Sequence, residues 1–466
     1  MKKISIICLV VFLLMSCFSV SALETEDLSV TSGCHSLDGQ VPFLGTTQLV
    51  SNAESALLYE INTDTLLYAY NADAQVQPSS LLKILTALIA IEKGSLTDVV
   101  TVRENVLDTL PHDAAVAGLQ VDEVLTVKDL IYCMMVVSGN DAAVVLADHI
   151  MGSQQAFIEE MNRYAAELGC TGTNFTNVHG IHNSNQYTTA RDVARILNKA
   201  MENEQFREVF SAKYYDLPAT NKSEARRLVT QNYFINEDRI AYYNPLVTGG
   251  RTAVNNDRSR SIATTAQQGD MDVICVVIGA KSKFEKDGYT EKVHGGYNET
   301  KELLNLAFNG NRTAQVLYSA QVIDQKTVLN GSSDVSVGVR DGAFSVIAED
   351  LDPNALSYRY MNEISLTAPI EAGQKIADLQ VWYGSVCLIQ TEAYAMNSVG
   401  VAGTLIEGNN RVKRDIGPIG IILYIVGGII VAGLCAFAVL YVLRMSRIAK
   451  VKRQSRRNSR NRRRSR

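Results

Sequence analysis

The feature that most constrains the fold is residues 84–91, which read ILTALIAI and are entered through residues 78–83, PSSLLK. A helix that is apolar on nearly every side has to lie inside a core, so this segment predicts a buried helix. Proline suits a helix start because its missing N–H costs little there. Residues three apart share one helix face, so Ser80 and Lys83 can meet at the mouth of this helix.

This pair can form a serine nucleophile that needs no histidine. The N-terminus of a helix places free N–H groups and positive potential beside the hydroxyl of Ser80. Burial favours the neutral form of Lys83, which can then accept the serine proton. The alternative is structural: Ser80 lies near an N-cap, and Lys83 extends its ammonium group from a core helix to solvent. Spacing by itself leaves both interpretations open.

Two further segments offer polar side chains to a cleft. The sequence MMVVSGNDAA places Ser138 and Asn140 on a turn before a helix, where both can point the same way. An ordinary turn with an N-cap is the alternative. The sequence VTGGRTA precedes two strand-like segments and predicts the edge of an antiparallel sheet, which presents Arg251 and Thr252 to a ligand. A plain hairpin with a solvated arginine is the alternative there.

In this order and at these separations the three motifs resemble those of the serine D-alanyl-D-alanine carboxypeptidases, the low-molecular-weight penicillin-binding proteins of peptidase family S11. The resemblance covers roughly residues 45–400. It implies an α/β (α+β) penicillin-binding, β-lactamase-like transpeptidase domain. It also implies removal of the terminal D-alanine from peptidoglycan stem pentapeptides, with no metal and no cofactor, and acylation by β-lactams as inhibitors.

Carried over residue by residue, the resemblance implies a role for each motif residue. Ser80 would be the nucleophile that forms the acyl-enzyme, and Lys83 would be its general base. Ser138 would relay a proton to the leaving amine, and Asn140 would hold the substrate backbone. Acyl transfer of this kind needs an activated hydroxyl, fixed donors for the oxyanion and a later attack by water.

The third motif departs from the family pattern Lys-Thr-Gly. By the resemblance, Arg251 and Thr252 would bind the terminal carboxylate of D-Ala-D-Ala, and the backbone N–H groups of Ser80 and Val254 would form the oxyanion hole. Arginine keeps the positive charge but is bulkier than lysine and does not give up a proton. Ala253 in place of glycine adds a methyl group where the substrate backbone passes. Two alternatives therefore stay open: a degenerate homologue that binds wall peptides with little or no turnover, and β-lactam hydrolysis.

The two ends of the chain indicate where this chemistry takes place. Residues 1–22 read as a signal peptide, with lipidation of Cys17 as the minor alternative. Residues 419–443 carry no charge and are long enough to span a bilayer as one transmembrane helix. Residues 444–466 hold twelve Lys or Arg and no acid, and positive charge marks the cytoplasmic side. We therefore expect a single-pass cell-membrane protein with an extracellular catalytic domain and a basic cytoplasmic tail.

Net charge bears on the expected partners. Because the tail adds +12 to a chain of net charge −5, residues 1–443 carry −17. An acidic exterior argues against binding anionic polymers, so the expected partners are stem peptides, β-lactams and the membrane, and not nucleic acid. For the basic tail itself, nucleic-acid binding is the alternative to a topology determinant that touches anionic lipid.

The mature chain is long enough for two cores. Residues 45–308 mix strands with helical patterns at 141–151 and 154–168, and their strands come from both ends of the segment, which predicts a sheet with helices packed around it. The Asn-Gly-Asn sequence at 309–311 is a natural boundary. Residues 312–405 predict a small all-β sandwich that spaces the catalytic domain from the membrane. Its strand-like runs are 315–322, 335–339, 344–348, 364–368 and 376–395.

The cysteines and histidines point away from a disulfide framework and from a metal site. Five cysteines lie in the exported part, an odd number at wide spacing. Two of them, Cys133 and Cys275, lie in apolar runs that are typical of core residues. His179 and His182 form a close pair in a loop rich in glycine and asparagine, where a structural role is expected.

Overall fold

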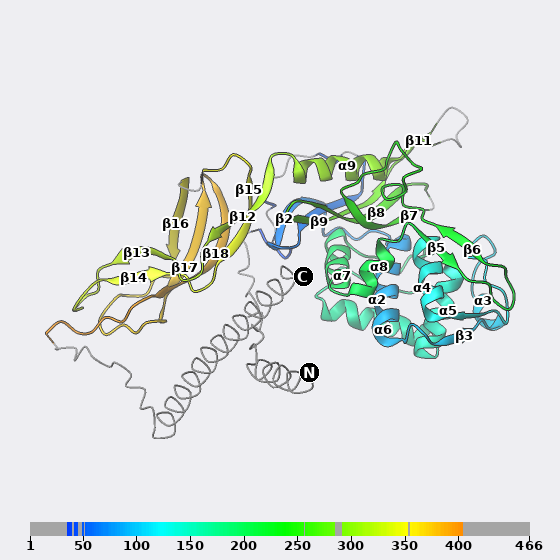
Figure 1. Ribbon diagram of the computed structural model, residues 1–466, viewed down its shortest axis with the longest axis horizontal. Coiled ribbons are helices and arrows are strands. Elements are labelled where there is room, and N and C mark those ends of the chain that lie inside the picture. The colour runs from blue at the N-terminus through cyan, green and yellow to red at the C-terminus, as the bar shows by residue number, and fades with distance from the viewer. Residues whose placement is uncertain are drawn as a thin grey trace, which may run out of the picture. The chain divides into compact units, whose positions relative to one another are not determined.

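The computed structural model describes residues 35–39, 42–44, 49–50, 52–255, 257–284, 291–352 and 355–403 (Figure 1). Within these residues, no helix has both the length and the apolar character needed to span a bilayer. The signal peptide, the transmembrane helix and the basic tail that the sequence predicts lie outside the described residues. All three stay predictions.

A five-stranded antiparallel sheet organises the first domain, with strand order β2-β1-β9-β8-β7. Its strands are β1 (Ser55–Glu60), β2 (Thr65–Tyr70), β7 (Val247–Val254), β8 (Arg260–Gln268) and β9 (Met271–Ala280). In the pairing of β1 with β9, Leu57 lies opposite Val276, which confirms the predicted sheet built from both ends of this segment. Strand β7, which carries the third motif, lies at one edge as predicted.

Both faces of this sheet are covered, which explains why β9 is apolar at nearly every position. Neighbouring residues of a strand point to opposite faces. Val276 therefore packs in a core with helices α2 to α8, whereas Val277 packs with α9 (Gly295–Phe308) on the other face. The helices of the first face are α2 (Lys83–Lys93), α3 (Glu104–Leu107), α4 (Val127–Val136), α5 (Asn140–Met151), α6 (Gln154–Glu167), α7 (Ala190–Met201) and α8 (Glu204–Phe210). Helices α5 and α6 confirm the helical patterns at 141–151 and 154–168.

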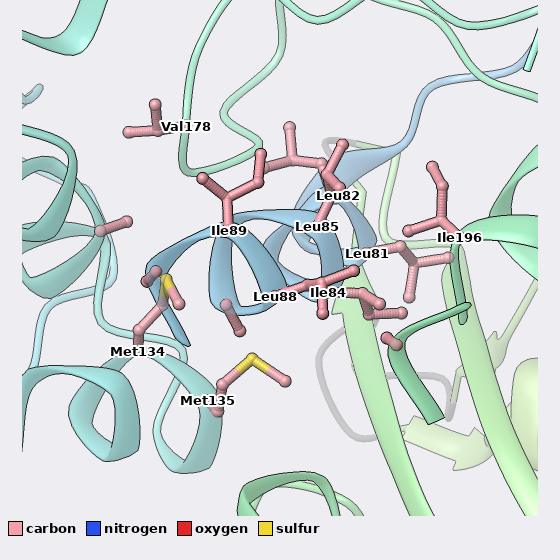
Figure 2. Close-up of a cluster of buried hydrophobic side chains, with 14 of the residues drawn as sticks. Leu81, Leu82, Ile84, Leu85, Leu88, Ile89, Met134, Met135, Val178 and Ile196 are labelled. Carbon is pink, nitrogen blue, oxygen red and sulfur yellow. The ribbon is translucent and has the colours of Figure 1, made fainter. Parts of the chain in front are cut away.

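Helix α2 is the buried helix that the apolar run predicts. Residues 83–91 are all buried. Figure 2 shows Met134 and Met135 of α4, Ile196 of α7 and Val178 from a loop arranged around it. Because burying a leucine or isoleucine side chain contributes about 1.5–3 kcal/mol, these contacts give the N-terminus of α2 a rigid support.

Two-stranded antiparallel pairs complete the first domain. They pair β3 (Val99–Thr101) with β4 (Val124–Thr126), β5 (Tyr214–Leu217) with β6 (Arg226–Val229), and β10 (Lys283–Phe284) with β11 (Glu291–Val293). Strand β4 runs directly into α4, where Thr126 and Asp129 form a capping box. The reciprocal hydrogen bonds of this box satisfy free N–H groups at the helix start. Helix α4 is thereby anchored at its beginning, and it ends two residues before Ser138.

The second domain is all β. A pair of strands, β12 (Asn311–Leu317) with β15 (Ala343–Ala348), shares one apolar core with a five-stranded sheet of order β13-β14-β18-β17-β16. The strands of that sheet are β13 (Val322–Lys326), β14 (Val335–Gly338), β16 (Leu356–Met361), β17 (Lys375–Tyr383) and β18 (Val386–Ala395). The all-β C-terminal domain that the sequence predicts is therefore present.

Not every predicted strand is correct. The run at 315–322 is split by a turn, and the run at 364–368 is not a strand. There the N–H of Thr367 bonds to Ser365 within a turn, and the N–H of Ala368 bonds to Leu329. The strand in this region is instead β16, which was not predicted although Leu356, Tyr358 and Tyr360 alternate with polar residues as in a half-buried strand.

The cysteines also differ in part from expectation. Cys133, Cys170 and Cys275 are free and buried, but Cys387 of β18 is disulfide-bonded. Wide spacing along the chain argued against a bridge, yet distance in sequence says nothing about distance in the fold.

Candidate active site

Ser80 and Lys83 lie where a short 3-10 turn meets the buried helix. The turn, η1, covers Ser79–Leu82, and Lys83 is the first residue of α2. Lys83 Nζ and Ser80 Oγ are 3.3 Å apart, so the three-residue spacing does bring the two groups together. The turn is entered through Pro78, in keeping with the preference of proline for the first turn of a helix.

The side chain of Lys83 is fully buried, and its amine contacts several polar atoms. It contacts the Ser138 carbonyl oxygen at 3.2 Å, Ser138 Oγ at 3.3 Å and Asn140 Oδ1 at 2.5 Å. Burial lowers the pKa of Lys83 well below its ordinary value of 10.5, and the charge of Arg251 lowers it further, while Asp141 acts in the opposite direction. A neutral amine carries a lone pair, so Lys83 can accept the proton of Ser80.

The turn between α4 and α5 places Ser138 next to Ser80 and Lys83, and these residues together with Asn140 form the polar cluster of the site. Ser138 has a positive φ of 64°, and its Oγ lies 3.3 Å from Ser80 Oγ. Gly139 comes next, and a Cβ there would lie 2.7 Å from Asp141 Oδ1 and 2.8 Å from Ala117 Cβ. Glycine is therefore required between the two polar residues because neighbouring atoms occupy the space of any side chain.

Asp141 is a residue of this site that reasoning from the sequence missed. Its buried carboxylate accepts backbone hydrogen bonds from Ala117, Gly118 and Leu119 at 2.8, 2.9 and 3.0 Å. These bonds hold the loop before β4 against the start of α5. The sequence does place an aspartate directly after Ser-Gly-Asn. An acidic residue in the first turn of a helix is common, because it interacts favourably with the helix dipole, so this position by itself did not indicate a role in the site.

Arg251 reaches the same cluster from the edge strand β7, and it is buried rather than solvated. Its Nε donates to the Ser80 carbonyl oxygen at 3.2 Å, its Nη1 donates to the Met135 carbonyl oxygen at 2.9 Å, and its Nη2 donates to Ser138 Oγ. Burial lowers the pKa of Arg251 to about 10, so the group stays charged at neutral pH. The structure thus places Arg251 beneath Ser80, and carboxylate binding by Arg251 stays a prediction.

A cleft of about 550 Å³ opens above the cluster. Ser80, Asn140 and Val254 line it, whereas Lys83, Ser138, Arg251 and Thr252 are not among its lining residues. Val254 is 54% exposed, and its carbonyl oxygen accepts a hydrogen bond from Ser79 Oγ at 3.5 Å. Strand β7 and the turn η1, which carries Ser79 and Ser80 and is called the nucleophile turn below, therefore lie side by side. The oxyanion hole and the binding role of Thr252 stay predictions.

The loop at residues 177–181 supports the nucleophile turn from the other side. Gly180 has a φ of +90°, and a Cβ on it would lie 2.1 Å from the Ser79 carbonyl oxygen and 2.8 Å from the Ser80 backbone nitrogen. The Gly180 N–H is held by Asn177 Oδ1 at 2.7 Å. Next to it, His179 lines the cleft, and burial lowers its pKa to about 4. Among the described residues, no group of three potential metal ligands is present.

We expect Gly180→Ala to disable the site. The new methyl group would meet backbone atoms of the nucleophile turn and would also force alanine to a positive φ, so the folded state should lose about 3 kcal/mol. Displacing Ser80 should slow labelling by a fluorescent penicillin about 100-fold. Gly169→Ala is the matched control, because Gly169 also has a positive φ of 73° but has no atom within 4 Å of an added Cβ. Equal labelling rates for the two variants would contradict the prediction.

Known proteins match this chain along most of its folded part. Residues 45–282 match the family model described as D-alanyl-D-alanine carboxypeptidase, and residues 312–401 match that of the penicillin-binding protein 5 C-terminal domain. D-alanyl-D-alanine carboxypeptidase DacC of Escherichia coli (strain K12) is 29% identical over 76% of this chain and 85% of its own length. DacA of Haemophilus influenzae is 28% identical, over 84% of this chain and 92% of its own.

A solved structure of a related protein matches the fold of this chain. Penicillin-binding protein 5 from Haemophilus influenzae superposes with a TM-score of 0.61 at 27% identity, and the match covers 76% of this chain and 100% of that one. The first family model spans more than half of the present chain. The chain therefore belongs to the D-alanyl-D-alanine carboxypeptidase family, the low-molecular-weight penicillin-binding proteins of peptidase family S11.

Proposed function

We propose that this protein is a membrane-anchored serine D,D-carboxypeptidase that removes the terminal D-alanine from peptidoglycan stem pentapeptides. One observation carries the proposal. Ser80 Oγ lies within 3.3 Å of both Lys83 Nζ and Ser138 Oγ at the base of an open cleft. Family membership supports the same activity, because the curated relatives bear this name.

The geometry supports a simple order of proton transfers. Neutral Lys83 takes the proton of Ser80 as its oxygen attacks the carbonyl carbon of the penultimate D-alanine. The leaving D-alanine amine then receives a proton through Ser138, whose Oγ contacts both Lys83 and Ser80. Water later attacks the acyl-enzyme and frees Ser80. A β-lactam would acylate the same oxygen and act as an inhibitor.

The test uses the full-length chain in detergent. D-alanine release from Nα,Nε-diacetyl-Lys-D-Ala-D-Ala is measured, and benzylpenicillin adducts are located by mass spectrometry of peptides. We expect release of D-alanine and an adduct on the peptide that contains Ser80. An adduct without release would favour a binding homologue over a carboxypeptidase, and turnover of penicillin would revive β-lactam hydrolysis. An adduct on another residue would overturn the proposal.

Anchoring is part of the proposal and rests on the sequence. The apolar residues 419–443 followed by the basic residues 444–466 support a single span with the catalytic domain on the wall side. Protease added to intact spheroplasts should digest the catalytic domain and leave a tag at the C-terminus protected. Protection of both parts would refute this topology.

A second candidate, a binding homologue with little turnover, is favoured by the position of Arg251. Its guanidinium group contacts both Ser138 Oγ and the Ser80 carbonyl oxygen, and it could hold these groups too tightly for proton transfer. If so, Arg251→Lys should raise D-alanine release about tenfold, since lysine keeps the charge but carries its donors on one nitrogen and cannot bridge the two groups as the planar guanidinium does. Unchanged or lower release in this variant, measured beside the wild type, would count against the second candidate.

A further inference from the structure

The full charges on the walls of the Ser80 cleft are all negative. Its lining includes the carboxylates of Glu54, Asp113 and Asp257, and none of its lining residues is lysine or arginine. Its two imidazoles belong to His179 and His182, and the pKa of His179, about 4, leaves that ring neutral at pH 7. The side chains that line the cleft therefore carry net negative charge, whereas the charged Arg251 lies beneath Ser80 and outside the lining.

The charge of Asp257 acts on the carboxyl group of Glu54. The Asp257 carboxylate is held by the Ser259 backbone N–H at 3.0 Å and by Ser259 Oγ at 2.6 Å, and these bonds lower its pKa. The pKa of Glu54 is raised, first by burial and then by the charge of Asp257, whereas the exposed Lys281 opposes this shift only as the third cause. The repulsion between the two carboxylates is thus incompletely balanced, and a cation placed between them would relieve it.

Asn255 adds an acceptor without a donor next to these carboxylates. Asn255 lines the cleft beside Asp257, and its Nδ2 donates to Ser259 Oγ at 2.8 Å. Its Oδ1 is buried and, among the described residues, has no hydrogen-bond partner. The carboxylates of Glu54 and Asp257 and the amide oxygen of Asn255 are all hydrogen-bond acceptors, so this part of the cleft suits a ligand group that donates hydrogen bonds.

The edge strand relates this acidic wall to the substrate. Strand β7 carries Arg251 and Thr252 and ends at Val254, whose carbonyl oxygen contacts Ser79, and Asp257 follows three residues later along the chain. If the terminal carboxylate lies at Thr252 and the scissile bond lies at Ser80, the preceding residues of the peptide extend toward Asp257. This placement rests on the proposed function. It brings the residue before D-Ala-D-Ala, the third residue of a stem peptide, to the acidic wall.

We propose that the cleft selects stem peptides whose third residue is a diamino acid with a free, charged side-chain amine, recognised by Glu54 and Asp257. A stem that has already been cross-linked through this amine carries an amide there and has lost the positive charge. The enzyme would consequently trim stems that are still free and discriminate against stems that are already joined as acceptors.

The experiment compares two peptides on the full-length protein in detergent. Nα-acetyl-Lys-D-Ala-D-Ala keeps a charged side-chain amine, and Nα,Nε-diacetyl-Lys-D-Ala-D-Ala lacks it. At low salt we expect kcat/KM to be about fivefold higher for the charged peptide, the size of a partly exposed ion pair. In 0.5 M NaCl the ratio should fall toward one, because salt screens exposed charges, whereas a preference due to the size of the second acetyl group would persist.

Variants of Glu54 and Asp257 test whether these two carboxylates cause the preference for the charged peptide. In Glu54→Gln combined with Asp257→Asn, the preference for the charged peptide should shrink to below twofold. Glu371→Gln, at an exposed position of the second domain, is the matched loss of one carboxylate and should keep the fivefold ratio. Equal kcat/KM for the two peptides in the wild type, or an unchanged preference in the double variant, would overturn the inference.

The experiment distinguishes failure of the proposed carboxypeptidase activity from failure of the proposed charge selectivity. If neither peptide releases D-alanine, the carboxypeptidase proposal fails, but the charge preference can still be measured. Each peptide is then titrated as a protectant against labelling by a fluorescent penicillin, and the charged one should protect at about fivefold lower concentration. Equal protection would overturn the selectivity without bearing on turnover.

Discussion

Replacing Ser80 by alanine should abolish both D-alanine release and labelling by a fluorescent penicillin. In the proposed mechanism the acyl group is transferred to Ser80 Oγ, so removing this atom removes the covalent intermediate and leaves only substrate binding. We expect the rate to fall by more than about 10⁴-fold, the range seen when the nucleophile of a serine hydrolase is removed. Release is measured with a coupled D-amino-acid oxidase assay, and labelling is measured on gels.

Ser79 provides a matched control one residue away. It carries the same side chain, and its Oγ makes one long contact, 3.5 Å, to the Val254 carbonyl oxygen. Ser79→Ala should keep labelling within about threefold of the wild type, since one exposed neutral hydrogen bond contributes about 0.5 kcal/mol or less. Persistent labelling of the Ser80 variant, or equal loss in both variants, would show that Ser80 is not the acylated residue.

Replacing Lys83 by methionine should slow acylation about 10³-fold, the contribution typical of a general base. Methionine fits the buried volume but has no lone pair on nitrogen to accept the Ser80 proton. It also leaves Asn140 Oδ1 and the Ser138 carbonyl oxygen without the donor that they contact now. The measurement is the rate constant for labelling by a fluorescent penicillin, with the free energy of unfolding determined in parallel to separate catalysis from folding.

The wild-type pH profile tests the same role. General-base function requires neutral Lys83, and its lowered pKa means that this form is populated well below pH 10.5. The rate of acylation should therefore rise with pH only to the lowered pKa and then stay level, and the variant should lack this rise. Lys93→Met, at the half-exposed end of the same helix, is the control and should keep both rate and profile. A wild-type rate that rises steadily to pH 10 would contradict neutral Lys83 as the base.

Local patterns in the sequence determined several parts of this protein. The apolar run at 84–91 predicted the buried helix α2, and the three-residue spacing predicted the contact of Ser80 with Lys83. The position of VTGGRTA before two strand-like runs predicted an edge strand. These predictions succeed because helix periodicity, strand length and turn preferences depend on neighbours within a few residues. Strand β16 was missed although LSYRYM alternates as a half-buried strand does, whereas the bonded Cys387 has no local signature.

Only the tertiary structure decided how the site is supported and what it faces. Gly180 touches the Ser79 backbone about 100 residues away along the chain, and Arg251 lies under Ser80 with its donors turned inward. Glu54 and Asp257 line the same cleft although about 200 residues separate them. Contacts of this kind arise where loops from different elements pack on the same rigid scaffold. Their identities depend on the three-dimensional course of the chain, which no local pattern encodes. Ser80 and Lys83, the proposed nucleophile and base, lie three residues apart, so their contact follows from local helix geometry.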